Sequence, residues 1–252
     1  MKVLIVYAHP EPRSFNGAMR DLAVDTLRGA GHEVAVSDLY AMRFHPVVGR
    51  GDFTRAHNPD VFKLGIEQGR AEAAGTYAED IVREHEKLKW CDTLILQSPL
   101  FWFSLPAILK GWVDRVMGVG FAYGADASYE NGGLRGRRAM LSLTTEGPPS
   151  GFGPRGRHGD IELILWPIQN GILRFVGFDV LPPFIAWCPA RLSNEERVVY
   201  LKEFKERLLE IPETPPIFFH DTVDYTEDNV LRPGIAPRPR FQQAAGAVAA
   251  RR

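Results

Sequence analysis

The sequence predicts an α/β domain built on a doubly wound, five-stranded parallel sheet with helices on both faces. Short continuous apolar runs, the pattern of strands buried on both faces, recur along the chain. Between them lie longer stretches in which apolar residues recur every three or four positions, which is typical of amphipathic helices. Such an alternation favours parallel strands joined by right-handed crossovers.

The first three predicted elements form a strand, a helix and a second strand. Residues 3–8 are a continuous apolar run, and residues 15–27 carry apolar side chains at helical spacing. Ser14 can cap the start of this helix, and residues 29–31 contain two glycines that can end it. Residues 33–37 predict the second strand, so the chain opens with a parallel βαβ unit.

The same rhythm continues through the middle of the chain. Residues 78–88 predict a helix and residues 93–97 a buried strand. The next helix is expected over 107–117, because Pro106 is favourable in a first turn. Residues 138–145 predict the fourth strand.

The last regular elements contain three prolines. Residues 161–175 predict an amphipathic helix that Pro167 should kink. Residues 179–185 predict a fifth strand at the sheet edge, because two prolines lie within it. Ser193 and Glu196 form a capping box for a final helix that runs towards Glu210.

Two segments do not follow this alternation. Residues 41–77 are a long insertion after the second strand, and the tail is rich first in proline and then in alanine. We therefore expect a catalytic domain over residues 1–215 and a C-terminal extension over residues 216–252. The end of that extension, from residue 241, is expected to be disordered.

The composition excludes several classes of protein. The 252 residues are 45% hydrophobic and 24% charged, with a formal net charge of -1. A nucleic-acid surface usually shows an excess of Lys and Arg, which is missing here. The two cysteines, Cys91 and Cys188, are expected to be reduced core thiols, and no metal site is expected. No apolar run approaches the roughly 18 residues of a membrane span, so we expect a cytoplasmic protein.

Ligands of such sheets bind beyond the carboxyl ends of the strands, which draws attention to three loops. The first, residues 9–16, ends at a helix N-terminus that can attract a phosphate, and Ser14 and Asn16 can add donors. Taken alone, the simpler reading is slightly favoured, in which Ser14 only caps the helix and His9 is an ordinary loop histidine.

The second loop, residues 98–105, places Leu100, Phe101, Trp102 and Phe103 directly after a buried strand. Clustered aromatic side chains suit a planar ligand, because flat faces stack and backbone N–H groups can bond ring heteroatoms. An aromatic plug that packs the domain or a dimer interface explains the cluster equally well.

The third loop, residues 145–159, is rich in glycine. Gly151, Gly153 and Gly156 spell GxGxxG, but they follow two prolines and lie several residues beyond the strand, so the dinucleotide fingerprint is rejected. The glycines instead suit a flexible wall that lets the backbone approach a ring. His158 is the residue of this third loop that can exchange a proton near neutral pH, although it can equally be a helix-start residue.

Several motifs occur together in one order. They are AHPEPRSFN (8–16), SDLYAM (37–42), SPLFWFSLPAILKGW (98–112), FAYG (121–124), LSLTT (141–145), HGD (158–160) and ILWPIQNGIL (164–173). With them the chain resembles, over roughly residues 3–215, the NAD(P)H:quinone oxidoreductase (DT-diaphorase) family and its bacterial relatives, which have a flavodoxin-like fold. The resemblance implies a homodimer with the flavin site at the subunit interface. It also implies non-covalent FAD and ping-pong transfer of a hydride from NAD(P)H to a quinone or similar flat acceptor.

The resemblance also implies roles for individual residues. The residues that would hold the pyrophosphate and ribityl part of FAD are His9, Ser14, Phe15 and Asn16. Those that would lie along the isoalloxazine are Pro99, Leu100, Trp102, Phe103, Thr144, Thr145 and Gly147. Asp114 and Arg197 match contacts to the adenosine half. Tyr123 and Phe175 match pocket residues that reach across from the partner subunit and complete, with Trp102 and Phe152, the pocket for nicotinamide and quinone.

Three positions depart from the family pattern. The family's proton relay pairs a tyrosine with the histidine, and Phe152 stands at the tyrosine position, so charge stabilisation would fall on His158 alone. Glu146 replaces a glycine and Ala125 a second pocket tyrosine, which favours a wider pocket and a different acceptor. The leading hypothesis is an oxidoreductase that acts on quinones, with side activity on nitro or azo compounds.

Two other functions are compatible with a flavin fold. One is a redox-sensing regulatory subunit of a membrane transporter, although the sequence shows no obvious docking helix. The other is a one-electron flavodoxin-like carrier, which is usually smaller and strongly acidic. The near-neutral charge argues against the carrier.

Overall fold

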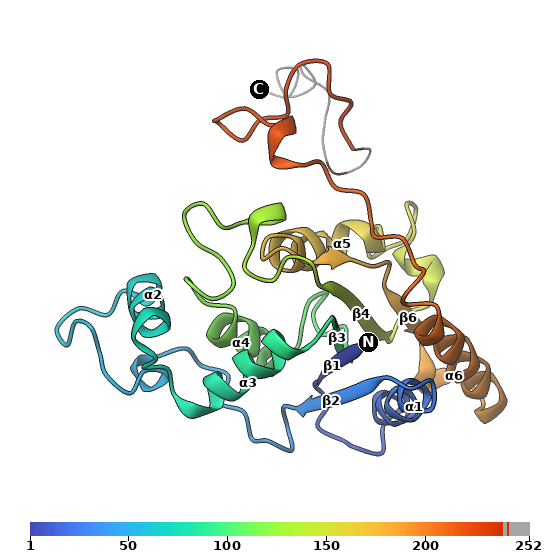
Figure 1. Cartoon of the computed structure of the whole chain (residues 1–252). Coiled ribbons are helices and arrows are strands. Elements are labelled where there is room, and N and C mark those ends of the chain that lie inside the picture. Colours follow the sequence, from blue (N-terminus) through green and yellow to red (C-terminus); the bar gives the residue numbers. More distant parts are fainter. Residues whose placement is uncertain (239–240, 242–252) are drawn as a thin grey trace.

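A parallel sheet forms the centre of the computed structural model, which describes residues 1–238 and 241 (Figure 1). Its strands lie in the order β2-β1-β3-β4-β5, and β6 pairs with the far end of β4. The first four are β1 (Lys2–Tyr7), β2 (Glu33–Asp38), β3 (Thr93–Pro99) and β4 (Arg138–Thr145). All strand pairs are parallel. The predicted doubly wound sheet is confirmed, and its order reverses between β1 and β3.

The fifth strand position is divided into two short strands. β5 (Asp179–Val180) pairs with the start of β4, and β6 (Phe184–Trp187) pairs with its end. Pro182 and Pro183 lie between them, and a proline cannot donate to a strand ladder. The predicted edge strand over 179–185 is therefore correct in place but interrupted at its prolines.

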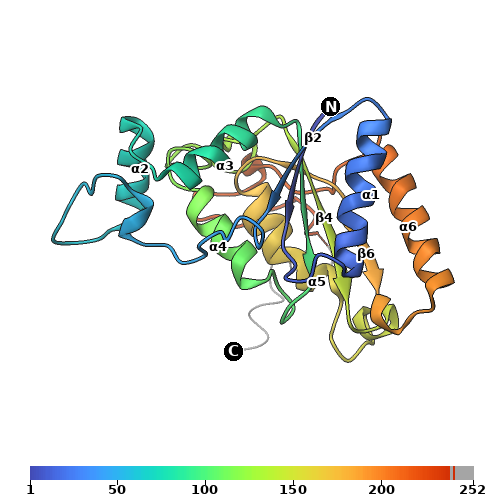
Figure 2. The same ribbon diagram turned by 90° about the horizontal axis from the view of Figure 1, so that it is seen from below.

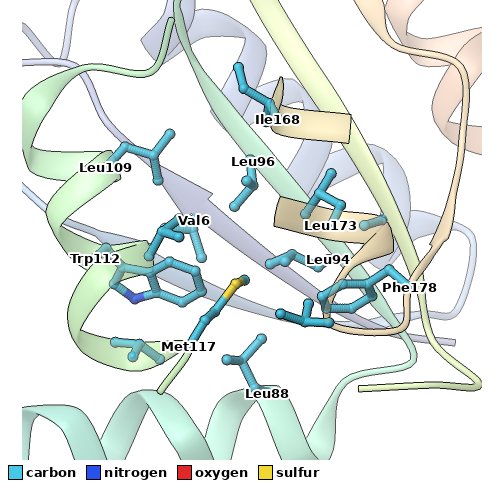
Figure 3. Close-up of a cluster of buried hydrophobic side chains, with 14 of the residues drawn as sticks. Val6, Leu88, Leu94, Leu96, Leu109, Trp112, Met117, Ile168, Leu173 and Phe178 are labelled. Atoms are coloured by element: carbon cyan, nitrogen blue, oxygen red, sulfur yellow. The ribbon is translucent and has the colours of Figure 1, made fainter. Parts of the chain in front are cut away.

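Helices cover both faces of the sheet (Figure 2). One face carries α1 (Phe15–Gly29) and α6 (Asn194–Leu209), and the other carries α3 (Glu79–Trp90), α4 (Ala107–Val116) and α5 (Ile161–Ile168). Alternate residues of β1 serve the two faces, since Val3 and Ile5 pack under α1 while Leu4 and Val6 belong to the other core. Figure 3 shows this second core, in which the buried ring of Trp112 lies beside Val6 of β1 and Met117.

The helix ends follow the predicted signals. The Ser14 hydroxyl accepts a hydrogen bond from the N–H of Gly17 at the start of α1, and Ser193 and Glu196 form the capping box of α6. Beyond Pro167 the chain stays helical but widens into a π-helical turn over Gln169–Arg174. Proline removes one helical hydrogen bond, so the predicted kink takes the form of a change in winding.

The insertion over 41–77 contains a helix, α2 (Leu64–Ala74), that the apolar pattern did not predict. Its sequence has two glycines and few apolar residues, so the helical periodicity is weak. Arg115 of α4 anchors the insertion. Its buried guanidinium donates from Nε to Asp52 over 2.9 Å and from Nη1 to Asp80 over 2.7 Å.

Both cysteines are buried and free, as expected. Burial raises the pKa of the Cys91 thiol to about 11, so it stays protonated at neutral pH. Beyond α6 the chain runs back past α5 (Figure 1), and the N–H of Ile217 donates to the carbonyl of Val180. The segment from residue 242, expected to be disordered, lies outside the described residues. Across residues 1–238, no helix is long and apolar enough to cross a membrane.

Candidate functional site

A cavity of about 1270 Å³ opens beyond the carboxyl ends of β1, β3, β4 and β6. All three loops singled out in the sequence contribute to its wall. Its lining includes most of the predicted binding residues: His9, Ser14, Phe15, Asn16, Pro99, Leu100, Trp102, Phe103, Thr144, Thr145, Gly147, Phe152, His158 and Arg197. The cavity therefore lies at the strand-order reversal, where doubly wound sheets bind ligands.

The first loop contributes the N-terminus of α1. The Ser14 hydroxyl is occupied by the N–H of Gly17 at 3.1 Å, so the capping interpretation of Ser14 is confirmed. The N–H groups of Phe15 and Asn16 have no acceptor among the described residues, as expected in a first helical turn. His9 receives a hydrogen bond on Nδ1 from the N–H of Glu11 over 3.0 Å. The backbone N–H groups of this loop are thus available to bind an anion, while its side chains make hydrogen bonds within the loop.

Asn16 ties this loop to the neighbouring strands. Its side-chain Nδ2 donates to the Thr144 hydroxyl over 2.8 Å, and its carbonyl accepts from Nε2 of Gln97 over 2.6 Å. All three residues are buried. Sequence reasoning treated Asn16 as a ligand donor and did not single out Gln97, whose role depends on a contact 81 residues away along the chain.

The second loop forms a tight turn that projects an aromatic side chain. Trp102 and Phe103 have φ angles of 49° and 59°, and the N–H of Ser104 donates to the carbonyl of Phe101 over 2.9 Å. Two consecutive left-handed residues between paired ends describe a type I′ turn, a conformation that favours Asn and Gly. Trp102 is 95% exposed, so the turn presents its ring to the cavity rather than to the core. Trp102 therefore does not pack the core of its own domain, as the aromatic-plug interpretation would require.

The third loop places two rings side by side. Phe152 is buried, and its ring centroid lies 4.8 Å from that of His158 and 5.3 Å from that of Trp187. The imidazole of His158 is exposed and makes no hydrogen bond to any side chain that the structure describes. A Cβ atom at Gly147 would lie 2.8 Å from Cε2 of Phe152 and 3.5 Å from Nε2 of His158. A side chain at 147 would thus crowd the ring of Phe152, whereas its contact with His158 would be an ordinary one.

The glycines of the rejected fingerprint serve the loop itself. A side chain on Gly156 would collide with the carbonyl of Gly151, so the loop crosses itself closely there. The next helix begins only at Ile161, with Asp160 as its cap. No tight strand-to-helix turn follows the motif, which agrees with rejecting the dinucleotide fingerprint.

Of a fourth wall, the sequence singled out Arg197 alone. Residues of the loop after β6 and of the first turns of α6 also line the cavity: Pro189, Ala190, Arg191, Asn194, Val198 and Leu201. The carboxyl-end rule, applied to the fifth strand, would have found this loop. The side chain of Arg197 is fixed there, since its Nε donates to the carbonyl of Pro189 over 2.8 Å. Arg13 of the first loop lines the cavity too.

The cavity lining is electropositive. Its charged side chains are Arg13, Arg191, Arg197 and Glu146, joined by the titratable imidazoles of His9 and His158. Three cations against one carboxylate favour a ligand with negative charge. The one acidic side chain among these lining residues is Glu146, which departs from the family pattern.

Three predicted site residues do not line this cavity. Asp114 lies on α4, where it pairs with Lys110 over 2.6 Å. Tyr123 and Phe175 lie together elsewhere, with ring centroids 5.2 Å apart. The structure of one chain thus separates the predicted site into a cavity and a distinct aromatic face.

Comparisons with known proteins agree with this architecture. A family model described as a flavodoxin-like fold matches residues 1–209. The chain is 47% identical to the ribosyldihydronicotinamide dehydrogenase [quinone] of Pongo abelii over 86% of this chain and 94% of that protein. It is 43% identical to NAD(P)H dehydrogenase [quinone] 1 of Rattus norvegicus, over 86% of this chain and 80% of that protein. The crystal structure of a candidate quinone reductase from Klebsiella pneumoniae superposes with a TM-score of 0.91 and 44% identity, covering 94% of this chain and 96% of that one.

Proposed function

Because this chain belongs to the quinone reductases of flavodoxin-like fold, we propose that it is an NAD(P)H dehydrogenase (quinone) that holds FAD in the cavity described above. The observation that carries the proposal is that two loops at the sheet's carboxyl edge line one cavity with aromatic side chains. One loop presents the exposed ring of Trp102. The other presents Phe152 and His158, and Phe103, from the same loop as Trp102, packs against His158 at a centroid distance of 5.5 Å.

The residues of the cavity fit a flavin dinucleotide. The N–H groups of Trp102 and Phe103 have no acceptor among the described residues, so they can bond the heteroatoms at the edge of a flat ring. The unpaired N–H groups at the start of α1 and the nearby arginines suit a pyrophosphate. Glycine at 147 leaves the space that a ring stacked near His158 requires.

His158 is the residue to which we assign charge stabilisation. Bound FAD would supply hydride transfer from NAD(P)H to the acceptor, and negative charge would develop beside the residues that hold its ring. Nε2 of His158 faces the region of Gly147, and the imidazole can place a proton there. Phe152 holds the imidazole by ring packing but has no hydroxyl to donate a second hydrogen bond. His158 therefore acts without a phenolic partner.

We also propose that the active unit is a homodimer. Tyr123 and Phe175 form an aromatic face outside their own chain's cavity, as residues that complete a neighbour's pocket must. Asp114 also lies outside its own chain's cavity, so on this proposal it contributes to the site of the partner subunit. The exposed ring of Trp102 would then stack with nicotinamide or quinone between the two chains.

The test is reconstitution of purified protein with FAD. Yellow protein that releases FAD on denaturation and oxidises NAD(P)H when a soluble quinone is added supports the proposal. Chromatography of the released cofactor separates FAD from FMN, and analytical ultracentrifugation gives the oligomeric state. A protein that binds flavin but reduces no quinone would contradict the enzyme function and favour the redox-sensing alternative.

A further inference from the structure

A buried cation joins the aromatic face to the C-terminal segment. Arg174 ends the π-helical turn directly before Phe175, and its side chain is 10% exposed. Its Nη2 donates to Asp221 over 2.9 Å and to Glu130 over 3.3 Å. The two carboxylates come from segments that are far apart in the sequence, so the guanidinium connects three parts of the chain.

Glu130 makes a second link to the same segment. Its Oε1 accepts from the N–H of Thr222 over 2.9 Å. Burial opposes ionisation of this carboxyl, but the hydrogen bonds from Thr222 and the charge of Arg174 hold its pKa below the usual value. Glu130 is therefore ionised at neutral pH, and the contact with residues 221–222 is charge-assisted.

The residues beside these two charges form the aromatic face. Tyr129 precedes Glu130, and its N–H donates to the carbonyl of Phe175 over 2.7 Å. The ring of Phe175 packs edge-on against Tyr129 at 5.4 Å and lies 5.2 Å from Tyr123. Tyr129 has a φ of 52°, a strained conformation that must be held by its surroundings.

The C-terminal segment docks there as a folded unit. The N–H of Arg232 donates to the carbonyl of Asp224 over 2.8 Å, which closes a loop through the turn at Thr226. His220 at the base of the loop is partly buried and contacts Asp224 over 3.3 Å. We call residues 220–232 the docking loop. It meets the domain at Asp221 and Thr222, directly at the Arg174 and Glu130 pair.

We propose that Arg174 is a positioning residue that uses the docking loop to hold Tyr123, Tyr129 and Phe175 in place, and so sets which flat acceptors the pocket accepts. This inference rests on the proposed function, in which the aromatic face completes the acceptor pocket. Releasing the loop frees a strained tyrosine, so the face loses its fixed width while the flavin cavity, built from other elements, is unchanged.

The experiment compares three variants of the FAD-loaded protein. Asp221→Asn removes the shorter ion pair, and Arg174→Lys keeps the charge but loses the planar guanidinium that reaches both carboxylates. Asp228→Asn is the matched control, because it makes the same charge change on the same loop at a side chain with no partner among the described residues. The KM and kcat for a small benzoquinone and a bulky naphthoquinone are measured, together with amide hydrogen exchange of peptides over 128–132 and 220–226.

We expect Asp221→Asn to raise the ratio of the KM for the bulky quinone to the KM for the small one by about tenfold. Its kcat and flavin content should stay within about twofold of the wild-type values. Hydrogen exchange should accelerate in both peptides of Asp221→Asn. Arg174→Lys should show effects intermediate between those of Asp221→Asn and the wild type, and Asp228→Asn should match the wild type. Faster exchange with the KM ratio unchanged would overturn the inference, as would unchanged exchange at 128–132. A wild type that reduces no quinone would instead contradict the proposed function, and the exchange data would still decide whether the loop holds Tyr129.

Discussion

The imidazole of His158 rests against the phenyl ring of Phe152, with their centroids 4.8 Å apart. Phe152 is buried while His158 is exposed to the cavity. Ring packing therefore fixes the orientation of the histidine, and no hydrogen bond from position 152 can share its task.

Replacing His158 with alanine should slow reduction of the bound flavin by NAD(P)H by about 10- to 100-fold, because a donor aimed at developing negative charge is lost. Stopped-flow bleaching of the flavin absorbance measures this step directly. His45→Ala, an exposed histidine outside the cavity, is the control and should be neutral. An unchanged rate in the His158 variant would remove the residue from the mechanism.

Phe152→Tyr should leave the fold intact and raise the rate of flavin reduction by up to about tenfold, since it adds a hydroxyl donor beside His158. The tyrosine keeps the ring packing on Trp187 and His158. Phe152→Leu, which loses the rings without adding a donor, should lower the rate. Equal rates in the tyrosine variant and the wild type would show that the hydroxyl does not reach the reacting ring.

Trp102→Gly should stabilise the flavin-free protein by about 1 kcal/mol while weakening substrate binding. The left-handed conformation of a bulky residue is unfavourable, glycine adopts it freely, and the indole is 95% exposed, so little burial is lost. Urea denaturation and the KM for quinone measure the two effects. Trp102→Ala should lose binding without gaining stability, and a less stable glycine variant would argue against strain in this turn.

Stability should fall as the pH drops below about 6.5, the usual pKa of histidine, through the buried His85. Burial lowers the pKa of His85, so the unfolded chain takes up a proton before the folded one does. The stabilisation is complete above the ordinary pKa and is lost progressively as the pH falls through the lowered value. The nearby charges are Glu72, Lys89 and Glu84, and Nε2 bonds the carbonyl of Val116 over 2.8 Å.

Urea midpoints at pH 7.5 and pH 5 give the size of this effect. The difference between the two midpoints should shrink in His85→Gln, which can still donate to Val116 but cannot titrate. His32→Gln, on a partly exposed loop residue, is the comparison. An identical pH difference in wild type and His85→Gln would assign the acid sensitivity to other groups.

Local signals in the sequence were sufficient for the elements and for three of the four cavity walls. The Ser14 cap, the Ser193 and Glu196 box and the strand runs each depend on neighbouring residues, so they can be identified without knowing the fold. Helix α2 was missed because its stability comes from contacts with the domain rather than from its own apolar pattern. Gln68, for example, is buried and donates from Nε2 to the carbonyl of Asp114 over 3.3 Å.

By itself, the amino-acid sequence determined the order of the strands and of most helices along the chain, the edge of the sheet where the cavity lies and the family to which the chain is similar. All of these depend on local patterns or on motifs that are continuous in the chain. The tertiary structure alone decided that Asn16 bonds Thr144, that Phe152 orients His158, and that Arg174 joins Glu130 to Asp221. These contacts bring together residues from separate elements, and their geometry exists only after the whole sheet and its crossovers have packed.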